Sequence, residues 1–490
     1  MKAAQMGVTE VAINRAFYTI DVLKRDVLYV LPTAVTASDF SKARFGGALV
    51  LSPYLKDIFT DTNTVGLKQA GGTCLYIRGS RGDSNLVSIP VSELILDEVD
   101  RMDQKQIWLA LERLSGKLEK HICAVSTPTV PKKGVHKLFL DSTQEEYKFQ
   151  CPRCGRWTEL IWPDCMEIHG ESVRDPECLN SRLICKECKG HLVQAEKPEW
   201  LAGAKWVPTV PHNPDNRGFH INQLYSFTVK PSDMVIAHFR GLGDESAGVE
   251  FNNSKLGLPY VPSGGQVDDE MIANCICGHT KSDPRPTNSA RLITMGLDQG
   301  KWNYVEITEW FFEEWGRDLN VAAVAKVLWE GTFTEDEWHI ADQLMREWQI
   351  LHCVVDADPQ INEVRRFARR FPGFVTLCRY RRGITGKEIS IQDDETDAPI
   401  ATVDRTNWID AALGRFHVPG RILLPRDTSE QYKDQIMSPA RTYEKDELGN
   451  AKAIYTETGP DHFAHARTYC EIALPFAASR TTHEDISKFL

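Results

Sequence analysis

Four of the thirteen cysteines in this chain occur as two pairs with the spacing of metal ligands. The pairs are Cys151 with Cys154, in CPRCG, and Cys185 with Cys188, in CKECKG. Two such turns can place four thiolates around one Zn²⁺, which leaves no open position for catalysis and stabilises a short segment that lacks an apolar core. The spacing therefore predicts a structural zinc site. Cys165 and Cys178 lie between the pairs without this spacing, and we expect them to be buried or unused.

A second group of residues has the types and order needed to hydrolyse a nucleoside triphosphate. Asp97 and Glu98 follow the apolar run LIL, so they should emerge at the carboxyl end of a buried parallel strand. The first carboxylate can hold the Mg²⁺ shell while the second polarises the attacking water. Ser126 and Thr127 end another apolar run, in HICAVSTPT, where their hydroxyls could sense the γ-phosphate.

The opening residues, MKAAQMGVTE, resemble a phosphate-binding loop with a displaced lysine. Gly7 is followed by Val8 and Thr9 rather than by lysine, and the only nearby lysine is Lys2. Apolar spacing predicts a helix over 8–24, and VLYVLP predicts a buried strand over 27–32. A loop, a helix and a strand in this order begin a phosphate-binding α/β domain.

Further elements must position these residues. Strands are expected at 73–78, 94–97 and 121–126, then in RLITMGLD, in NYVEITEWFFEEW and in HCVVDAD, which follows a helical segment. The aromatic-rich segment 201–260 is expected to be irregular, and the polar, proline-containing segment 280–290 to be a linker.

Composition indicates a multidomain globular protein of 490 residues with a net charge of −11. No apolar run is long enough to span a bilayer or to serve as a signal peptide, so we expect a cytoplasmic protein. A nucleic-acid groove needs only a local basic lining. Basic clusters occur at 365–370 and 379–383, although each alone is typical of a solvated surface.

The segments KAAQMGVTE, LILDEVDRM and VSTPT, in this order, resemble the large terminase subunits of tailed bacteriophages, particularly the lambda-like branch. GFHINQLYSF (218–227) and FNNSKLGLPY (251–260) extend the resemblance over most of the chain. The resemblance implies an α/β multidomain protein: a P-loop ATPase with a parallel sheet and a zinc-ribbon insert, followed by an RNase H-like nuclease domain. Relatives carry an adenine-binding segment and a leading strand before the loop, so we expect the ATPase domain to be N-terminally truncated.

In that branch the phosphate lysine precedes the loop. The resemblance therefore implies that Lys2 binds phosphate, Gly7 provides the turn, Thr9 offers a hydroxyl to Mg²⁺, and Gln5 belongs to the same nucleotide site. Lysine can do this from another backbone position because its long side chain carries a mobile point charge. Three arginines, Arg15, Arg44 and Arg101, remain open as an arginine finger.

The resemblance also implies a nuclease site in which acids from distant elements bind two divalent metals. The implied acids are Asp298 and Asp356, each ending an apolar strand, and Asp461, before a C-terminal helix; Asp358 shares the face of Asp356 if that strand continues. Many relatives have an acid where this chain has His465, so either Asp461 is the third ligand with His465 assisting, which we favour, or His465 replaces the carboxylate. Histidine suits Mn²⁺ better than Mg²⁺. Arg381 and Arg382 are the candidate contacts to the DNA backbone.

The resulting prediction is a large terminase subunit that packages double-stranded viral DNA into procapsids by ATP hydrolysis and cuts concatemeric DNA. The predicted domains are the ATPase core 1–145, the zinc-ribbon insert 146–200, the remaining lid and linker 201–285, and the nuclease 286–490. The implied cofactors are ATP, Mg²⁺ at both sites with Mn²⁺ as an alternative, and Zn²⁺. The implied partners are DNA, the small terminase subunit and the portal of the procapsid, with a ring on the portal or an isolated monomer, in the host cytoplasm.

Two other hypotheses compete with this one. A repair-type helicase-nuclease would need helicase motifs between Glu98 and the cysteine pairs, and the sequence has none. A zinc-stapled DNA-binding or scaffold protein with a decayed nucleotide site would not need Asp97, Glu98 and three well-placed aspartates, all of which are present.

Overall fold

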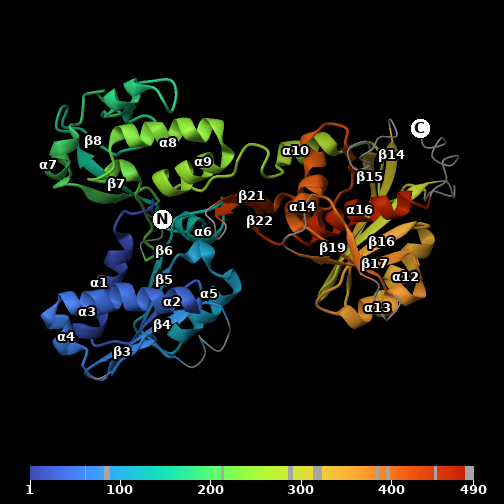
Figure 1. Cartoon of the computed structure of the whole chain (residues 1–490), viewed down its shortest axis with the longest axis horizontal. Coiled ribbons are helices and arrows are strands. Elements are labelled where there is room, and N and C mark those ends of the chain that lie inside the picture. Colours follow the sequence, from blue (N-terminus) through green and yellow to red (C-terminus); the bar gives the residue numbers. More distant parts are fainter. Residues whose placement is uncertain are drawn as a thin grey trace. The chain divides into compact units, whose positions relative to one another are not determined.

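A computed structural model of the chain describes residues 1–480 except 61, 82–85, 87–88, 211–214, 285–290, 313–322, 382–385, 393–397 and 446–449. The chain divides into two compact units, Met1–Val261 and Pro262–Leu490. Figure 1 shows the elements of each unit. Among the described residues, no helix combines the length and the apolar character needed to cross a bilayer.

The first unit is built on a six-stranded sheet in the order β2-β3-β4-β1-β5-β6. Its strands are β1 (Val27–Leu31), β2 (Thr62–Asn63), β3 (Leu67–Ala70), β4 (Thr73–Gly79), β5 (Glu93–Asp97) and β6 (His121–Val125). The four strands β4, β1, β5 and β6 are parallel, so their carboxyl ends share one edge. The predicted strands of this domain are confirmed.

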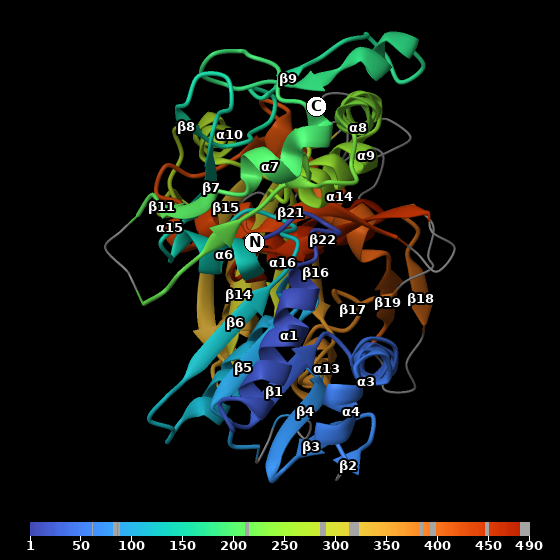
Figure 2. The same cartoon turned by 90° about the vertical axis from the view of Figure 1, so that its left-hand side faces the viewer.

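Helices cover this sheet because apolar strands such as β1 are buried on both faces. They are α1 (Val8–Asp21), α2 (Ala34–Phe40), α3 (Gly46–Leu51), α4 (Pro53–Ile58), α5 (Gln104–Leu111) and α6 (Gly134–Leu140). Helix α1 packs on β1, β4, β5 and β6 through a buried stripe that includes Ile13, Phe17 and Ile20 (Figure 2). The predicted helix after the opening loop is therefore present.

A smaller sheet in the order β11-β7-β12, with β8 paired to β7, joins the cysteine-rich segment to the first unit. Its elements are β7 (Glu145–Gln150), β8 (Trp157–Thr158), β11 (Lys205–Pro208) and β12 (Phe219–His220); the pair β9 (Met166–Glu167) and β10 (Arg182–Leu183) and the helix α7 (Lys197–Leu201) lie between them in sequence.

The expectation of an irregular segment over 201–260 is wrong. The structure has α8 (Pro231–Gly243) and α9 (Glu245–Glu250) there, followed by a π-helical stretch, Phe251–Leu256. Pro231 at the first helical position and Asp233, which accepts from the Lys230 backbone N–H, are ordinary start signals. The aromatic residues that suggested irregularity instead pack against one another, as Trp206 and Phe219 do.

The second unit is built on an eight-stranded mixed sheet in the order β18-β19-β17-β16-β13-β14-β15-β20. Its strands are β13 (Leu292–Asp298), β14 (Trp302–Phe312), β15 (Ala323–Thr334), β16 (His352–Asp356), β17 (Val375–Tyr380), β18 (Ser390–Gln392), β19 (Ile400–Val403) and β20 (Ile422–Leu423). Strands β13, β14 and β15 form an antiparallel meander, and β16 and β17 continue the sheet in parallel from β13. The expectation of an α/β multidomain protein with a parallel sheet in its first part is confirmed, since the chain forms two units built on α/β sheets.

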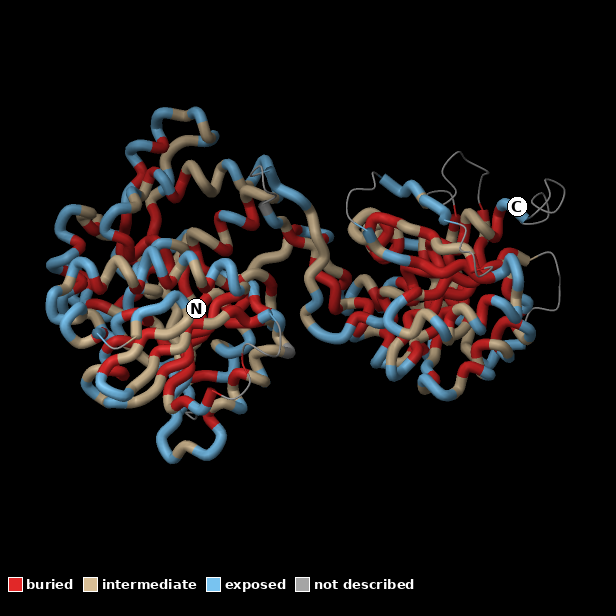
Figure 3. Tube along the Cα trace, turned by 60° about the horizontal axis from the view of Figure 1, so that its bottom comes forward, coloured by how far each residue is buried: buried red, intermediate tan, exposed pale blue. Residues whose placement is uncertain are grey.

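Helices cover both faces of this sheet, and its strands form a continuous buried core (Figure 3). They are α10 (Asp269–Cys275), α12 (Trp338–Glu347), α13 (Ile361–Arg370), α14 (Arg405–Gly414), α15 (Glu430–Met437) and α16 (His462–Ala478); a hairpin of β21 (Pro439–Lys445) and β22 (Ala451–Glu457) precedes α16. Helix α16 lies directly on β13 at Gly296. A Cβ built on Gly296 would stand 1.9 Å from the Ala466 carbonyl oxygen, so only glycine permits this approach.

Candidate functional site

The opening loop is held in place by segments that lie more than one hundred residues away. The Lys2 N–H donates to the Ser126 carbonyl at 3.1 Å, Ala3 N–H to Ile221, and Ala4 N–H to Ser254. The Gln223 amide donates to the Ala4 carbonyl. The blocks 218–227 and 251–260, which carried the family resemblance, are thus the supports of this loop.

Lys2, Thr127 and Glu98 meet at the carboxyl edge of the parallel sheet. The buried Lys2 Nζ lies 3.4 Å from Thr127 Oγ1 and 3.8 Å from Glu98 Oε1. Three segments that are separated in the sequence therefore place an ammonium, a hydroxyl and a carboxylate together. An ammonium, a hydroxyl and a carboxylate are among the groups that nucleoside triphosphatases use.

Asp97 and Glu98 end β5 in different environments. Asp97 is 1% exposed, and its Oδ2 accepts from the Tyr29 hydroxyl at 2.7 Å. Its Oδ1 is buried without a hydrogen-bond partner in the described part of the chain, which suits a carboxylate that binds a cation. Burial raises the pKa of Asp97, and hydrogen bonds from Tyr29 and, more weakly, from Thr9 oppose that shift.

Glu98 adopts the left-handed conformation, with φ 65° and ψ 46°. This backbone is strained for a residue with a side chain and is found mostly at functional positions. Asp100 holds the strained turn, because its carboxylate accepts from Thr129 N–H, Thr129 Oγ1 and Val135 N–H. Sequence reasoning gave no role to Tyr29, which lies inside the predicted strand VLYVLP, or to Asp100, although Asp100 belongs to the segment LILDEVDRM.

The other predicted nucleotide residues lie in or near the opening loop. Gln5 is exposed with φ 57°, and Gly7 is the N-cap of α1 with φ 76°, at a helix end that no side chain caps. Such an end offers backbone N–H groups and a positive dipole to a phosphate. Ser126 is turned away, because its hydroxyl accepts from Asp100 N–H and donates to the Thr127 carbonyl.

The three arginines that are candidates for an arginine finger differ in their contacts. Arg15 makes a two-point contact with the buried Glu93, which fixes it to the sheet. Arg44 pairs with Glu10, and Arg101 lies 3.8 Å from Glu98 with most of its side chain exposed.

The four paired cysteines form one cluster. The sulfurs of Cys151, Cys154, Cys185 and Cys188 lie within 4.8 Å of one another, and Cys151 and Cys188 are 4.0 Å apart. Four thiolates about 2.3 Å from one zinc ion would be separated by about 3.8 Å, so the cluster fits this ion. Cys165 and Cys178 are buried outside it, as expected.

The predicted nuclease acids lie at one edge of the second sheet. Asp298 ends β13 and Asp356 ends the adjacent parallel strand β16, in which Val355 pairs with Leu297. Asp461 is the N-cap of α16, the helix that crosses β13. Three elements thus bring three carboxylates to one region, although the cysteine cluster is the one group among the described residues whose ligand atoms all lie within 4.8 Å.

Cationic or proton-donating side chains stand between these carboxylates. His462 Nδ1 lies 2.8 Å from Asp298 Oδ2, and its ring stacks on Tyr304 with centroids 4.5 Å apart. His465 Nε2 lies 3.3 Å from Asp461 Oδ2, and the guanidinium of Arg405 lies 3.6 Å from the same oxygen. Sequence reasoning gave no role to His462 or Arg405; the spacing of His462 from Asp461 was the available signal for the first.

The carboxylates differ in their electrostatics. Burial and the charge of Asp298 raise the pKa of Asp356 to about 7. Burial alone would raise the pKa of Asp461, but the hydrogen bond and charge of His465 and the charge of Arg405 outweigh it and lower that pKa. The hydrogen bond with Asp298 raises the pKa of His462 despite burial. Neighbouring carboxylates with separated pKa values and positive partners are typical of a functional site.

Two expectations concern residues that follow Asp356: the strand face of Asp358, and the basic residues Arg381 and Arg382. Strand β16 ends at Asp356, so Asp358 does not continue its face; Asp358 instead makes a two-point contact with Arg379. Arg381 is exposed just after β17, and Arg382 lies outside the described residues.

The first unit thus carries a candidate nucleotide site on a parallel sheet, and the second carries a candidate acidic site on a mixed sheet. Two family models match the chain: "Phage terminase large subunit gpA, ATPase domain" over residues 1–206 and "Terminase large subunit gpA, endonuclease domain" over residues 216–377. The chain belongs to the phage terminase large subunits, whose ATPase and endonuclease act in phage DNA packaging. The helicase-nuclease and scaffold hypotheses are therefore set aside.

Solved structures that match the chain include large terminases. The HK97 bacteriophage large terminase is 13% identical over 96% of this chain and 90% of that chain, with a TM-score of 0.46. A large terminase from a thermophilic bacteriophage, in complex with ATP-gamma-S, is 13% identical over 97% and 93%, with a TM-score of 0.28. The large terminase nuclease of the thermophilic phage G20c with bound magnesium is 11% identical over 42% and 96%, with a TM-score of 0.27. No curated protein matches the chain.

Proposed function

We propose that the first unit hydrolyses ATP to drive double-stranded viral DNA into a procapsid and that the second unit cuts the DNA concatemer. The observation that carries the first part is the meeting of Lys2, Thr127 and Glu98. The observation that carries the second part is that Asp298, Asp356 and Asp461 lie at one edge of the second sheet. The subunit would act in the host cytoplasm with the small terminase subunit and a portal, as a ring on that portal.

In the ATPase site, each side chain has one task. Lys2 places its ammonium between Glu98 and Thr127, where a γ-phosphate would lie. The left-handed turn at Gly7 and the start of α1 would hold the remaining phosphates, with Gln5 beside them. Asp97 and Thr9 would hold Mg²⁺, which neutralises charge on the phosphate oxygens.

Glu98 would accept a proton from the water that attacks the γ-phosphorus. Its strained turn is coupled to the strand end after β6, because Asp100 bonds Thr129 and Val135, and the Asp100 N–H donates to Ser126. Loss of the γ-phosphate would release Lys2 and Thr127 and could shift this linked turn. Ser126 would then relay the change through its backbone contacts rather than by touching phosphate.

In the nuclease site, Asp298, Asp356 and Asp461 would hold the divalent ions, with His465 assisting at Asp461. Mg²⁺ or Mn²⁺ bound there would supply an activated water and stabilise the leaving oxygen. His462 and Arg405 now contact Asp298 and Asp461, respectively, and would be displaced or turned towards a DNA phosphate. Arg381 and Arg382 would contact the backbone of the duplex.

We propose that Zn²⁺ binds the cluster of Cys151, Cys154, Cys185 and Cys188 and stabilises the insert. We also propose that the domain boundaries expected from the sequence describe the functional parts. The chain divides into its compact units between Val261 and Pro262, inside the expected lid and linker segment 201–285, and α10 packs in the second unit. The segment 218–257 supports the nucleotide loop, which favours counting that segment with the ATPase.

DNA-stimulated ATP hydrolysis by the full chain tests the proposal, with Glu98→Gln as the blank. Lys2→Ala should reduce turnover to that blank, whereas Lys24→Ala, an exposed lysine paired with Asp21, should leave it unchanged. Equal activity in Lys2→Ala and the parent chain would contradict the role of Lys2. Cleavage of plasmid DNA by the chain and by Asp356→Asn tests the second site independently, and retained cleavage in Asp356→Asn would contradict it.

A further inference from the structure

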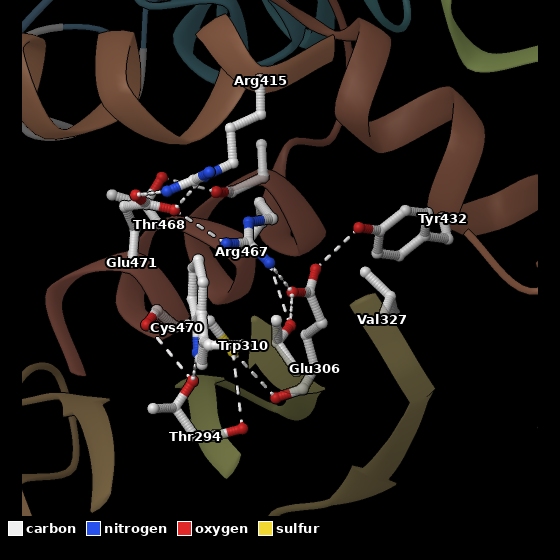
Figure 4. Close-up of polar contacts among 12 residues, drawn as sticks. Thr294, Glu306, Trp310, Val327, Arg415, Tyr432, Arg467, Thr468, Cys470 and Glu471 are labelled. Atoms are coloured by element: carbon white, nitrogen blue, oxygen red, sulfur yellow. Dashed lines mark hydrogen bonds and ion pairs between the residues drawn. The ribbon is translucent and has the colours of Figure 1, made fainter. Parts of the chain in front are cut away.

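A cluster of buried charges ties helix α16 to the sheet of the nuclease domain (Figure 4). It consists of Arg467 and Glu471 on α16, Glu306 on β14, and Arg415 just after α14. Three of these side chains are fully buried, and Arg415 is 5% exposed. None of them has a part in the chemistry proposed above, so their presence in the core needs another explanation. We call them the α16 charge cluster.

Each charged group of the α16 charge cluster pairs with one of opposite sign, although Arg467 Nε is buried without a hydrogen-bond partner among the described residues. Arg467 donates to Glu306 Oε1 at 2.5 Å and to Glu471 Oε2 at 2.8 Å, and Arg415 donates to both oxygens of Glu471 at 2.8 and 2.7 Å. The Tyr432 hydroxyl donates to the other oxygen of Glu306 at 2.6 Å. Burial by itself lowers the pKa of Arg467, but the two carboxylates reverse this and raise it, so the guanidinium stays charged. Two positive and two negative charges leave the cluster neutral.

Stability alone does not explain such a cluster. Taking four charges out of water is costly, and well-packed apolar residues of similar volume are often equally or more stabilising. Breaking a single pair, by contrast, leaves an uncompensated buried charge. A buried ionic cluster therefore penalises any other alignment of the elements that it joins.

Helix α16 crosses β13 through backbone atoms and small side chains, while its larger side chains, such as Phe463 and Tyr469, pack against rings of neighbouring elements. At the crossing with Gly296 it presents backbone atoms of Ala466 and Cys470, and small side chains occupy much of its buried surface. A slip of one residue moves a helix by about 1.5 Å and turns it by about 100°. Small side chains oppose such a slip weakly, whereas the Arg467–Glu306 pair would be broken by it.

The same alignment fixes the nuclease site. Glu306 lies opposite Gly296 across the β13–β14 pair, and Tyr304 lies opposite Asp298 two residues further on. These positions lie on one face of the sheet because the side-chain period of a strand is two. His462, at the start of α16, bonds Asp298 and stacks on Tyr304. The charge cluster and the acidic site are therefore two contacts of one helix with one pair of strands.

We propose that Arg467 and Glu306 are positioning residues of the endonuclease, which set the register of α16 and thereby place Asp461 and His462 against Asp298. The proposal rests on the nuclease site described above. Trp310 supports the arrangement, since its ring lies 4.9 Å from the Arg415 guanidinium and 5.0 Å from that of Arg467, and its indole N–H donates to Thr294 on β13.

The test removes all four charges together in the full chain, as Glu306→Met, Arg467→Met, Glu471→Leu and Arg415→Met. Because no charge is left unpaired, the variant should unfold in urea at the parent midpoint or above it. Mn²⁺ affinity, measured by electron paramagnetic resonance, should weaken about 10- to 100-fold, the range found when the groups that orient ligands are removed. The kcat for DNA cleavage should fall at least as far, with KM for DNA within about twofold. Parent values of Mn²⁺ affinity and kcat in a folded variant would overturn the proposal.

A milder variant covers the case in which the fourfold change prevents folding. Arg467→Lys keeps the charge but cannot bond Glu306 and Glu471 in the same fork, so it should fold and still lose Mn²⁺ affinity and kcat. Arg441→Lys, which alters a pair with Asp410 in the same unit, is the matched control and should behave as the parent. Parent behaviour of Arg467→Lys would also overturn the proposal.

Asp298→Asn separates this proposal from the one on which it rests. If Asp298→Asn binds Mn²⁺ and cleaves DNA as the parent does, the assignment of the nuclease site fails, and the positioning role fails with it. If Asp298→Asn loses both properties while the charge-free variant keeps them, the nuclease assignment stands and the positioning role alone is refuted.

Discussion

Replacing Gly296 by alanine should disable the nuclease while leaving the ATPase unit intact. The added Cβ would lie 1.9 Å from the Ala466 carbonyl oxygen and 2.5 Å from the Cys470 nitrogen, both backbone atoms of α16 that cannot rotate away. An ordinary contact begins at 3.4 Å, so the helix would have to withdraw by about 1.5 Å. The 2.8 Å contact between His462 and Asp298 would then pass beyond hydrogen-bond reach.

Two magnitudes follow from that displacement. Overpacking of a filled core costs about 1–3 kcal/mol, which should appear as a lower free energy of unfolding of the nuclease domain in urea. A misplacement of about 1 Å can cost about 100-fold in rate, so kcat for DNA cleavage should fall at least about that much. DNA-stimulated ATP hydrolysis by the same preparation reports on the first unit and should be unchanged.

Gly414→Ala is the matched control, because Gly414 lies in the same unit with a helical backbone and nothing within 4 Å of an added Cβ. It should keep parent stability and cleavage. If Gly296→Ala also keeps both, α16 does not need its present approach to β13, and the account of how the acidic site is assembled is wrong.

The chain should carry about one zinc ion per molecule, as measured by mass spectrometry. Cys151→Ser should lose the ion and lower the stability of the first unit. Cys165→Ser should keep the ion, because the Cys165 thiol donates to the Glu159 carbonyl instead. DNA cleavage should be faster in Mn²⁺ than in Mg²⁺ because His465 adjoins Asp461, and an equal or lower rate in Mn²⁺ would count against His465 as a ligand. Burial lowers the pKa of His352 from 6.5 to about 3, so its contribution to stability is full above pH 6.5 and is lost as the pH falls towards 3. Between pH 7 and 5 the parent should therefore lose roughly 2 kcal/mol more than His352→Leu in urea unfolding, and equal losses would contradict the shift.

Local patterns were enough to predict several elements of both sites. The run LIL before Asp97 and Glu98 predicted β5 and the position of both acids at its end, because an apolar run of strand length is buried wherever the sheet forms. The same reasoning located the strands that end at Asp298 and Asp356. The cysteine spacing predicted the cluster, since a CxxC turn fixes the distance between its own sulfurs.

Interpretations based on the local sequence were less successful where contacts between distant residues determine the structure. The segment 201–260 was expected to be irregular because it is rich in aromatic residues. Instead α8 forms there, and aromatic side chains such as His238 and Phe251 each pack against Trp162. Asp358 was expected to share the face of Asp356 only if the strand continued; β16 ends at Asp356, and Arg379 on the neighbouring strand binds Asp358. A charge partner in another strand has no signal in the local sequence.

The sequence by itself determined the strand ends that carry the acids, the cysteine cluster and the family to which the chain belongs. Tertiary structure alone decided that Lys2 reaches Thr127 and Glu98, that His462 bonds Asp298, and that Glu306 is buried against Arg467. The physical reason is separation along the chain. Periodicity and turn chemistry act within about ten residues, whereas these contacts join side chains many tens of residues apart and exist only after the sheets and helices have packed.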